Sequence, residues 1–457
     1  MADQPNAGQP GTGAASGRSA PPRETSGPGS GPQDQDSQSR KPPSRRIAVG
    51  LVLSLISVFI LSQFFRTAIA VIAPDFMRET GLSAANLGLM TGAYFLAAAA
   101  MQLPVGVLFD RYGPRAVVPA MMTLAVAGAL IFGLAESTGL LVLGQVLIAA
   151  GCSGIFIGGL LIFGRWFAPD RFATISAAAF AVSGLGMLAS GTPFAAAVEW
   201  IGWRGGYLAM SGVTAALALL IFAVIRDAPP GHPWTRRERE SLRETLHGLG
   251  RILRHREMLG LFAMCFVTYG SIMSVRGLWA GPYLTGIHGL GTIMLGNVLV
   301  LLSLAGIAGL TIYGPLDRVF NTRKRIVMAG GFLNAACLIT LAGLGDPPLV
   351  LAVTLLAAGA MLGAVHVQIL AHGRAFFGEE MSGRLLTALN FATFTGVGVL
   401  QIASGAIIDA LTPTGADVPL DAFRAAFAFL GLVLLSALAI YARTTDKPPR
   451  GRKGVSE

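Results

Sequence analysis

The sequence is poor in charged residues and in cysteine. Only 13% of its 457 residues are charged, whereas soluble domains carry about 25%, so an ordinary soluble protein is excluded. The three cysteines, Cys152, Cys265 and Cys337, lie far apart inside apolar segments, which excludes a disulfide framework and a metal-ligand spacing. Hydrophobic residues make up 53% of the chain. This composition is typical of a chain solvated by lipid.

Clusters of titratable side chains are also missing. The six histidines are scattered, and only His366 and His372 share one apolar segment. A polytopic membrane enzyme would need such a cluster, so we expect no catalytic residue, no metal and no cofactor. The net charge of +10 does not indicate a nucleic-acid partner, because most basic residues flank apolar runs, where they meet lipid headgroups.

Twelve apolar segments between Ile47 and Arg443 are long enough to span a bilayer, which takes about 20 residues each. The predicted spans are 47–73, 84–108, 115–135, 138–163, 171–198, 205–226, 258–284, 292–316, 323–344, 348–371, 383–411 and 420–442. Residues 1–46 and 444–457 are predicted to be cytoplasmic tails, the first one disordered. Residues 227–257 are predicted to form a charged cytoplasmic linker helix between two sets of six spans, 47–226 and 258–443.

Basic residues predict the orientation. Of the 34 Lys and Arg, Arg78, Arg204 and Arg424 lie on one side of the predicted membrane, and Arg66 and Arg276 lie inside spans. The others lie in tails and alternate loops on the opposite side. The positive-inside rule therefore predicts that both termini are cytoplasmic, in a multi-pass protein of the plasma membrane. We expect a monomer.

The two sets of spans share sequence marks at similar offsets. Asp110 recurs as Asp317, Gly164-Arg165 as Gly373-Arg374, and Trp203-Arg204 as Phe423-Arg424. Together, and in order, these marks indicate parallel repeats. The predicted fold is an all-α membrane protein with twelve transmembrane helices in two pseudosymmetric six-helix bundles.

The stretch Gly106-Val-Leu-Phe-Asp110-Arg111-Tyr-Gly-Pro-Arg115 resembles the signature loop of the major facilitator superfamily, with a degenerate copy around Asp317-Arg318. The resemblance covers residues 47–443 and implies a secondary transporter that works by alternating access. It also implies that Asp110, Arg111 and Arg115 are gating residues, together with Asp317 and Arg318 of the copy. Arg384 is a candidate partner in the other bundle. The alternative is that this stretch is a solvated turn whose basic residues only set the orientation of the protein in the membrane.

Arg66 and Arg276 are the candidate substrate ligands. They lie 20 residues past Arg46 and Arg256, so they occupy equivalent depths in the first and seventh spans, and no carboxylate lies mid-span to neutralise them. An intramembrane arginine is costly, and its fork matches carboxylate or phosphate oxygens. An anionic substrate is the economical explanation; bonds to backbone carbonyls, or snorkelling, are the alternatives.

The stretch from Phe65-Arg66 to Pro74 is similar to organophosphate:phosphate antiporters and organic anion:cation symporters, which carry a substrate-binding arginine in helix 1. The antiporters add one in helix 7, which Arg276 matches. Helical spacing and the superfamily's cavity-lining helices add four polar candidates, for which interhelical hydrogen bonds are the alternative. They are Gln63, Tyr269, His366 and Asn390.

The predicted function is transport of a small organic anion, a carboxylate or phosphate ester, with a coupling proton or a counter-anion. The lipid bilayer is its other partner. One alternative is a proton-coupled exporter of drugs, which would usually carry a membrane-embedded carboxylate. An alternative of another class is a membrane sensor or receptor that does not transport.

Overall fold

The structure of the chain is a computed structural model, which describes residues 45–228, 250, 252–377, 379–413 and 415–449. They belong to one compact unit, Pro43–Glu457. Within the described ranges the regular secondary structure is helical, without a strand. Most of the predicted linker helix, and nearly all of the predicted N-terminal tail, lie outside the described residues.

Ten helices form the first half of the protein, defined as residues 45–228. They are α2 (Arg45–Thr67), α3 (Ile69–Thr80), α4 (Ala84–Ala100), α5 (Gln102–Tyr112), α6 (Pro114–Leu134), α7 (Thr138–Ser153), α8 (Ile155–Trp166), α9 (Pro169–Ser183), α10 (Leu185–Ala189) and α11 (Thr192–Val224). Several follow one another with a single residue between them, so that one membrane pass comprises two or more helices. For example, α2 and α3 are separated by Ala68 alone.

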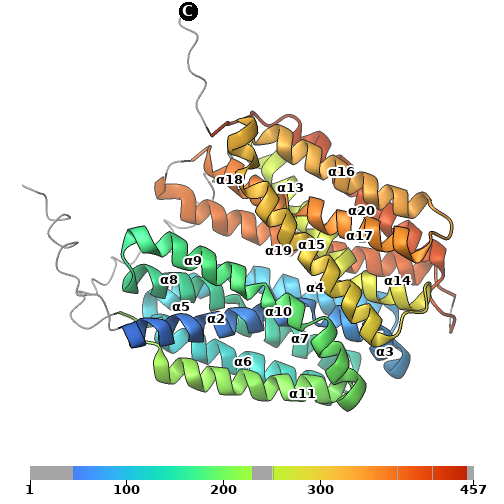
Figure 1. Cartoon of the computed structure of the whole chain (residues 1–457), viewed down its shortest axis with the longest axis horizontal. Coiled ribbons are helices and arrows are strands. Elements are labelled where there is room, and N and C mark those ends of the chain that lie inside the picture. Colours follow the sequence, from blue (N-terminus) through green and yellow to red (C-terminus); the bar gives the residue numbers. More distant parts are fainter. Residues whose placement is uncertain (1–44, 229–249, 251, 378, 414, 450–457) are drawn as a thin grey trace, which may run out of the picture. The chain divides into compact units, whose positions relative to one another are not determined.

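The described residues from 250 to 449 form the second half. Its helices are α13 (Met258–Ser274), the π-helix η1 (Val275–Trp279), α14 (Ala280–Gly286), α15 (Thr292–Phe320), α16 (Lys324–Gly343), α17 (Leu349–Gly363), α18 (His366–Arg374), α19 (Glu379–Ala410) and α20 (Leu420–Tyr441). Helices α13, η1 and α14 follow one another directly. The helices of each half lie together, blue to green and yellow to red in Figure 1.

Within the described residues, ten helical segments are long and apolar enough to span a membrane, or eleven if the bent pair of α4 and α5 is one span. One of the ten, Thr174–Val224, has 51 residues, which at about 1.5 Å per residue is more than twice the thickness of a bilayer core. Gly202 interrupts it with a φ of 71°. It therefore holds two passes, which gives the predicted twelve.

Local signals explain where several helices begin. The side-chain oxygens of Ser83 and Ser137 accept hydrogen bonds from backbone N–H groups two or three residues into the first turns of α4 and α7. Pro114 occupies the first turn of α6, after Gly113 with a φ of 75°. Because only glycine adopts this conformation without strain, the chain turns sharply there.

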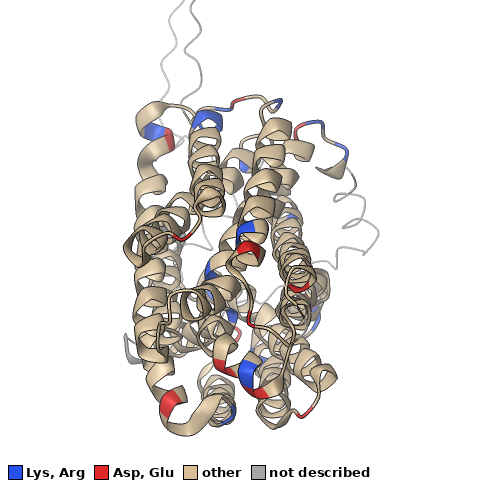
Figure 2. Cartoon of the chain, turned by 90° about the vertical axis from the view of Figure 1, so that its right-hand side faces the viewer, with Lys and Arg blue, Asp and Glu red and all other residues tan. Residues whose placement is uncertain are grey.

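The two ends of the helical assembly differ in charge. The acidic end, on the right of Figure 1 and facing the viewer in Figure 2, holds the loop residues 81–83, 135–137, 287–291, 344–348 and 411–413. Its three arginines each pair with a carboxylate: Arg78 with Asp75, Arg204 with Glu79, and Arg424 with Asp421. The opposite, basic end holds residues 113, 167–168, 225–228, 321–323 and 442–449. The positive-inside rule predicts that the acidic end is the outer one.

Glycines bring the two halves into backbone contact near the acidic end. A Cβ atom placed on Gly88 of α4 would lie 2.6 Å from the carbonyl oxygen of Gln401 in α19 and 3.1 Å from the Cα of Gly405. One turn further, a Cβ on Gly92 would lie 2.7 Å from the carbonyl oxygen of Gly398. Small residues allow such close approach of helices in membranes. We call this contact the glycine seam.

Hydrogen bonds between the halves lie at the same end. Thr192 of α11 donates to the Asn297 side chain of α15 at 2.7 Å. The backbone N–H of Ala85 donates to Asp409 at 3.4 Å. Thr292 donates to Asp75 at 3.5 Å. With the glycine seam, these bonds close the acidic end in this conformation.

Candidate functional site

Arg66 lies deep in the helical assembly and has aromatic neighbours. It occurs 21 residues after the start of α2 and 14 before the end of α3, which places it about 31 Å and 21 Å from the two ends of that pass. Its guanidinium carbon lies 5.6 Å from the ring centroid of Phe156 and 5.2 Å from that of Phe394. Tyr94 is among its electrostatic neighbours. Within the described residues no carboxylate forms an ion pair with Arg66.

Arg276 lies at the same depth but has different neighbours. A Cβ on the adjacent Gly277 would lie 4.0 Å from the backbone oxygen of Arg66, so the two helices meet there. The Arg276 side chain is 6% exposed. Its Nη2 donates to Ser303 of α15 at 2.6 Å, and its Nε has no hydrogen-bond partner. Arg276 belongs to the π-helix η1, a rare conformation that often marks functional sites.

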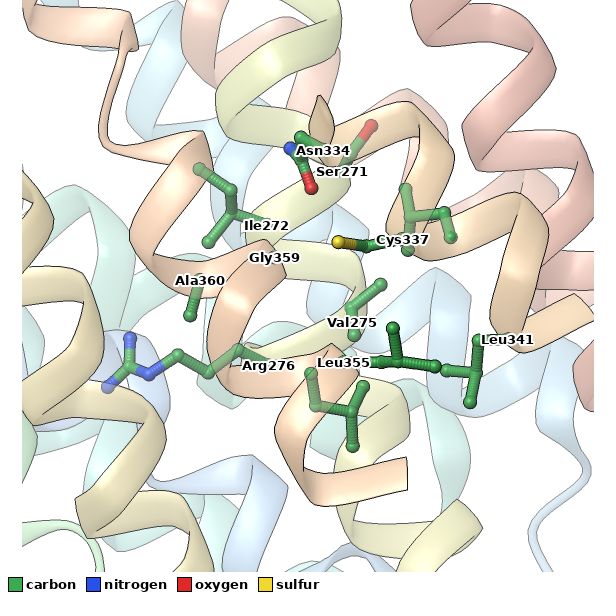
Figure 3. Close-up of a pocket in the computed structure, with 12 residues that line it drawn as sticks. Ser271, Ile272, Val275, Arg276, Asn334, Cys337, Leu341, Leu355, Gly359 and Ala360 are labelled. Carbon is green, nitrogen blue, oxygen red and sulfur yellow. The ribbon is translucent and has the colours of Figure 1, made fainter. Parts of the chain in front are cut away.

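The stem of Arg276 borders a cavity of about 20 Å³ between α13, α16 and α17. Figure 3 shows the guanidinium pointing away from Cys337 on the opposite wall. Ser271 and Asn334 also line this cavity, and each has a buried side-chain atom without a hydrogen-bond partner. A cavity of this size holds about one water molecule, so it is too small for an organic substrate.

The four supporting candidates divide into a pair and two separate residues. Tyr269 and His366 lie together, with ring centroids 5.0 Å apart. Gln63, one turn before Arg66, contacts the Met187 sulfur at 3.9 Å. Asn390 is half-buried in α19. Of the four candidates, the structure thus places Tyr269 and His366 next to each other.

The signature loop lies at the basic end. Asp110, Arg111 and Arg115 are exposed there, and Arg111 lies 5.3 Å from the ring centroid of Tyr112. Asp110 forms no ion pair within the described ranges. The charge network around Asp110 stays a prediction for the conformation in which the basic end is closed, since the closed end here is the acidic one.

The copy of this loop in the second half, unlike the signature loop, contains an ion pair among the described residues. Asp317 is buried and bonds to Arg323 at 3.2 Å. Arg318 is exposed, and Arg384 is half-buried near the start of α19. The equivalent aspartates of the two halves therefore differ in their environment, although their sequence positions match.

An aspartate that follows the last helix of each half caps the helix that begins at the loop. Asp227 accepts a hydrogen bond from the backbone N–H of Arg115 at 2.8 Å, in the first turn of α6. Asp446 accepts two from the backbone N–H groups of Arg323 and Lys324, both at 3.1 Å, at the start of α16. A carboxylate there satisfies free N–H groups and complements the helix dipole. We call these residues the terminal caps.

A further hydrogen bond to a backbone carbonyl oxygen lies beside each terminal cap. Trp166 at the end of α8 donates its indole N–H to the carbonyl oxygen of Arg226 at 2.9 Å. His372 in α18 lies 3.0 Å from the carbonyl oxygen of Thr445. These two hydrogen bonds occupy equivalent places in the two halves. They also mean that the predicted C-terminal tail begins with residues that pack against the helices.

Replacing Asp446 by Ala is expected to lower the stability of the protein by about 0.5–2 kcal/mol, the usual cost of losing a helix cap. Burial raises the pKa of this carboxyl, but hydrogen bonds from Thr322, Lys324 and Arg323 outweigh it and hold the pKa below its ordinary range. The ionised carboxylate therefore stabilises the fold above pH about 4, and this contribution is lost as the pH falls through the lowered pKa.

Thermal unfolding in detergent at pH 7 and at pH 3 measures the effect. The difference in Tm between wild type and Asp446→Ala should shrink at pH 3. Asp446→Asn should keep part of the cap, and Asp421→Ala, at an exposed ion pair of the acidic end, is the control. A difference that is the same at both pH values would contradict the proposed role of the charge.

Comparisons with known proteins agree on one family. The sequence model of the Major Facilitator Superfamily matches residues 55–396. A probable sulfoacetate transporter of Cupriavidus necator is 24% identical over 300 residues, which cover 63% of this chain and 68% of that protein. A probable L-galactonate transporter of Escherichia coli is 23% identical over 433 residues, 88% of this chain and 90% of that protein.

The fold is also found in solved structures. A bacterial homologue of the human lysosomal transporter Spinster, in an inward-facing and occupied conformation, aligns with a TM-score of 0.69. The alignment covers 88% of this chain and 98% of that one, at 20% sequence identity. At this identity the likeness concerns the fold alone.

Proposed function

Because this chain belongs to the major facilitator superfamily, we propose that it is a secondary active transporter of a small organic anion, a carboxylate or phosphate ester. It works by alternating access in the plasma membrane, with both termini in the cytoplasm. That it is a multi-pass membrane transporter and not an enzyme follows from the family and the relatives. The anion, the orientation and the residues below are the proposal.

One observation carries the proposal of an anionic substrate. Arg66 is a half-buried cation in the middle of a membrane pass, with two aromatic rings beside it and no carboxylate partner among the described residues. A guanidinium has five N–H donors, and these neighbours satisfy few of them. An oxyanion supplies the missing acceptors and neutralises a charge that is costly at this depth.

Arg276 is proposed as the second arginine of the site. It lies at the same depth in the membrane as Arg66, as the contact through Gly277 indicates. Within the described part of the chain it donates one hydrogen bond, to Ser303, so most of its N–H groups remain for a ligand. In this conformation it is turned toward Ser303. We propose that substrate binding, or the opening of the acidic end, turns it toward Arg66.

The proposed gate at the basic end consists of Asp110, Arg111 and Arg115 with Arg384 across the halves. When the acidic end opens, the basic end must close, and the exposed charges at the signature loop then come within reach of the second half. The coupling ion is a proton or a second anion. His366, whose ring centroid lies 5.0 Å from that of Tyr269, is the proposed proton carrier if a proton is used.

Transport by the purified protein in proteoliposomes tests the proposal. We expect saturable uptake or counterflow of at least one member of a panel of carboxylates, sulfonates and phosphate esters. An imposed pH gradient, compared with a preloaded anion, distinguishes proton symport from exchange. Extrusion of cationic dyes without anion flux would instead support a drug exporter, and anion binding without any flux a receptor.

A further inference from the structure

Two phenylalanines from different halves flank the Arg66 guanidinium. Phe156 belongs to α8 and Phe394 to α19, and their ring centroids lie 5.6 Å and 5.2 Å from its central carbon. Both distances lie within the range of a cation–π contact. The arginine therefore contacts rings of both halves at once.

Other rings hold Phe156 in place. It stacks on Phe180, with ring centroids 5.1 Å apart and planes 4° apart, and on Phe59 at 4.6 Å. Phe59 is fully buried, and a Cβ on Gly159 would lie 2.3 Å from its ring. Phe156 therefore belongs to a stacked cluster with Phe59 and Phe180, which restricts its movement.

Phe394 is placed by α19, the helix of the glycine seam. Its ring centroid lies 6.4 Å from that of Phe95 in α4, and α4 and α19 touch through the seam nearer the acidic end. The position of this ring relative to Arg66 therefore depends on how closely the two halves approach.

The chemistry of the flanked guanidinium restricts what it can bind. Its N–H donors lie in the plane of the group. Aromatic rings attract the cation but offer no strong acceptor for polar substituents. A ligand that presents its oxygens to the N–H groups therefore brings the atoms next to the oxyanion close to the two rings.

We propose that Phe156 and Phe394 are specificity-determining residues that restrict the Arg66 site to compact oxyanions. The rings favour a carboxylate or sulfonate whose neighbouring atoms are few and apolar over longer anions that carry several hydroxyl groups. This inference rests on the proposed function, because it presupposes that Arg66 binds the substrate.

Competition binding to the purified full-length protein tests this, with sulfoacetate as the compact probe and galactonate as the bulky one. Wild type should bind sulfoacetate more tightly. Phe394→Ala and Phe156→Ala should each shift the affinity ratio toward galactonate by about tenfold, the usual effect of enlarging an apolar pocket. Phe394→Leu, which refills the space without a ring, should keep the wild-type preference.

The matched control is Phe391→Ala. Phe391 lies one turn before Phe394 on the same helix but is 47% exposed, so its loss should leave the ratio unchanged. Since a loss of folding alone affects both probes together, the ratio separates specificity from stability. If wild type prefers galactonate, or if both alanine variants keep the wild-type ratio, the inference is wrong and the proposed function stands. If wild type binds no organic anion, the proposed function fails.

Discussion

Arg66→Gln is expected to weaken binding of the anionic substrate by about ten- to a hundredfold. Hydrogen bonds between ionised groups contribute about 1.5–3 kcal/mol each, and 1.4 kcal/mol corresponds to a factor of ten. Arg66→Lys keeps the charge but loses the planar fork. It should bind nearly as weakly as Arg66→Gln if the anion is held by two parallel bonds.

Equilibrium binding to purified variants that remain monodisperse measures this effect. Arg276→Gln should also weaken binding, whereas Arg78→Gln, at an exposed ion pair of the acidic end, should leave it unchanged. If both Arg66→Gln and Arg276→Gln bind the identified anion with wild-type affinity, the two arginines are structural and the anion site lies elsewhere.

Gly92→Leu is expected to reduce transport by about ten- to a hundredfold while leaving the helices intact. A Cβ at this position would lie 2.6 Å from a side-chain carbon of Ile402 and 2.7 Å from the carbonyl oxygen of Gly398. Overpacking of this kind costs about 1–3 kcal/mol. Because the contact exists only while the acidic end is closed, the substitution should favour the conformation in which that end is open.

The opening can be measured separately from transport. Ala70 is 1% exposed and packs against Gly281 of the second half, so a cysteine placed there should react slowly with a membrane-impermeant maleimide. In the Gly92→Leu background it should react faster. Gly212→Leu in α11 is the control, because nothing lies within 4 Å of its Cβ position. Unchanged labelling with normal transport would show that the glycine seam does not act as a gate.

The membrane passes were predictable from the sequence because lipid imposes a simple rule. Each pass needs about 20 apolar residues, and the helix ends agree with the expected spans within a few residues at most positions. Among them, the predicted span 420–442 is α20, Leu420–Tyr441. Arg66 and Arg276 could be singled out because a charge inside an apolar run is rare whatever its partners are.

The surroundings of Arg66 could not be predicted in the same way. Tyr94, Phe156 and Phe394 lie in apolar spans where aromatic residues are common, and their meeting at Arg66 depends on how three helices are rotated about their own axes. The weak amphipathicity of buried membrane helices does not encode this rotation. The different neighbours of Arg66 and Arg276 have the same origin, because equal depth does not determine the direction in which each side chain points.

The terminal caps, by contrast, did leave a signal in the sequence. Asp227 and Asp446 are 219 residues apart, close to the offsets of the other repeated marks. Neither belongs to the signature loop or to a span, so both read as ordinary linker and tail residues. Their offset could have singled them out, but their role is seen only from the contact with the first turns of α6 and α16.

The terminal caps also indicate where the chain can be divided into two fragments that each fold with their own capping residue. In each half, the aspartate that caps the first turn of the third pass belongs to that same half. A chain cut between residues 228 and 250 would therefore give two fragments that each retain their own cap. Co-expression of residues 1–228 and 250–457 should reconstitute a functional transporter, whereas a fragment that ends at Val224 should assemble poorly. The duplicated ancestral unit would then extend past its last helix and end at this aspartate.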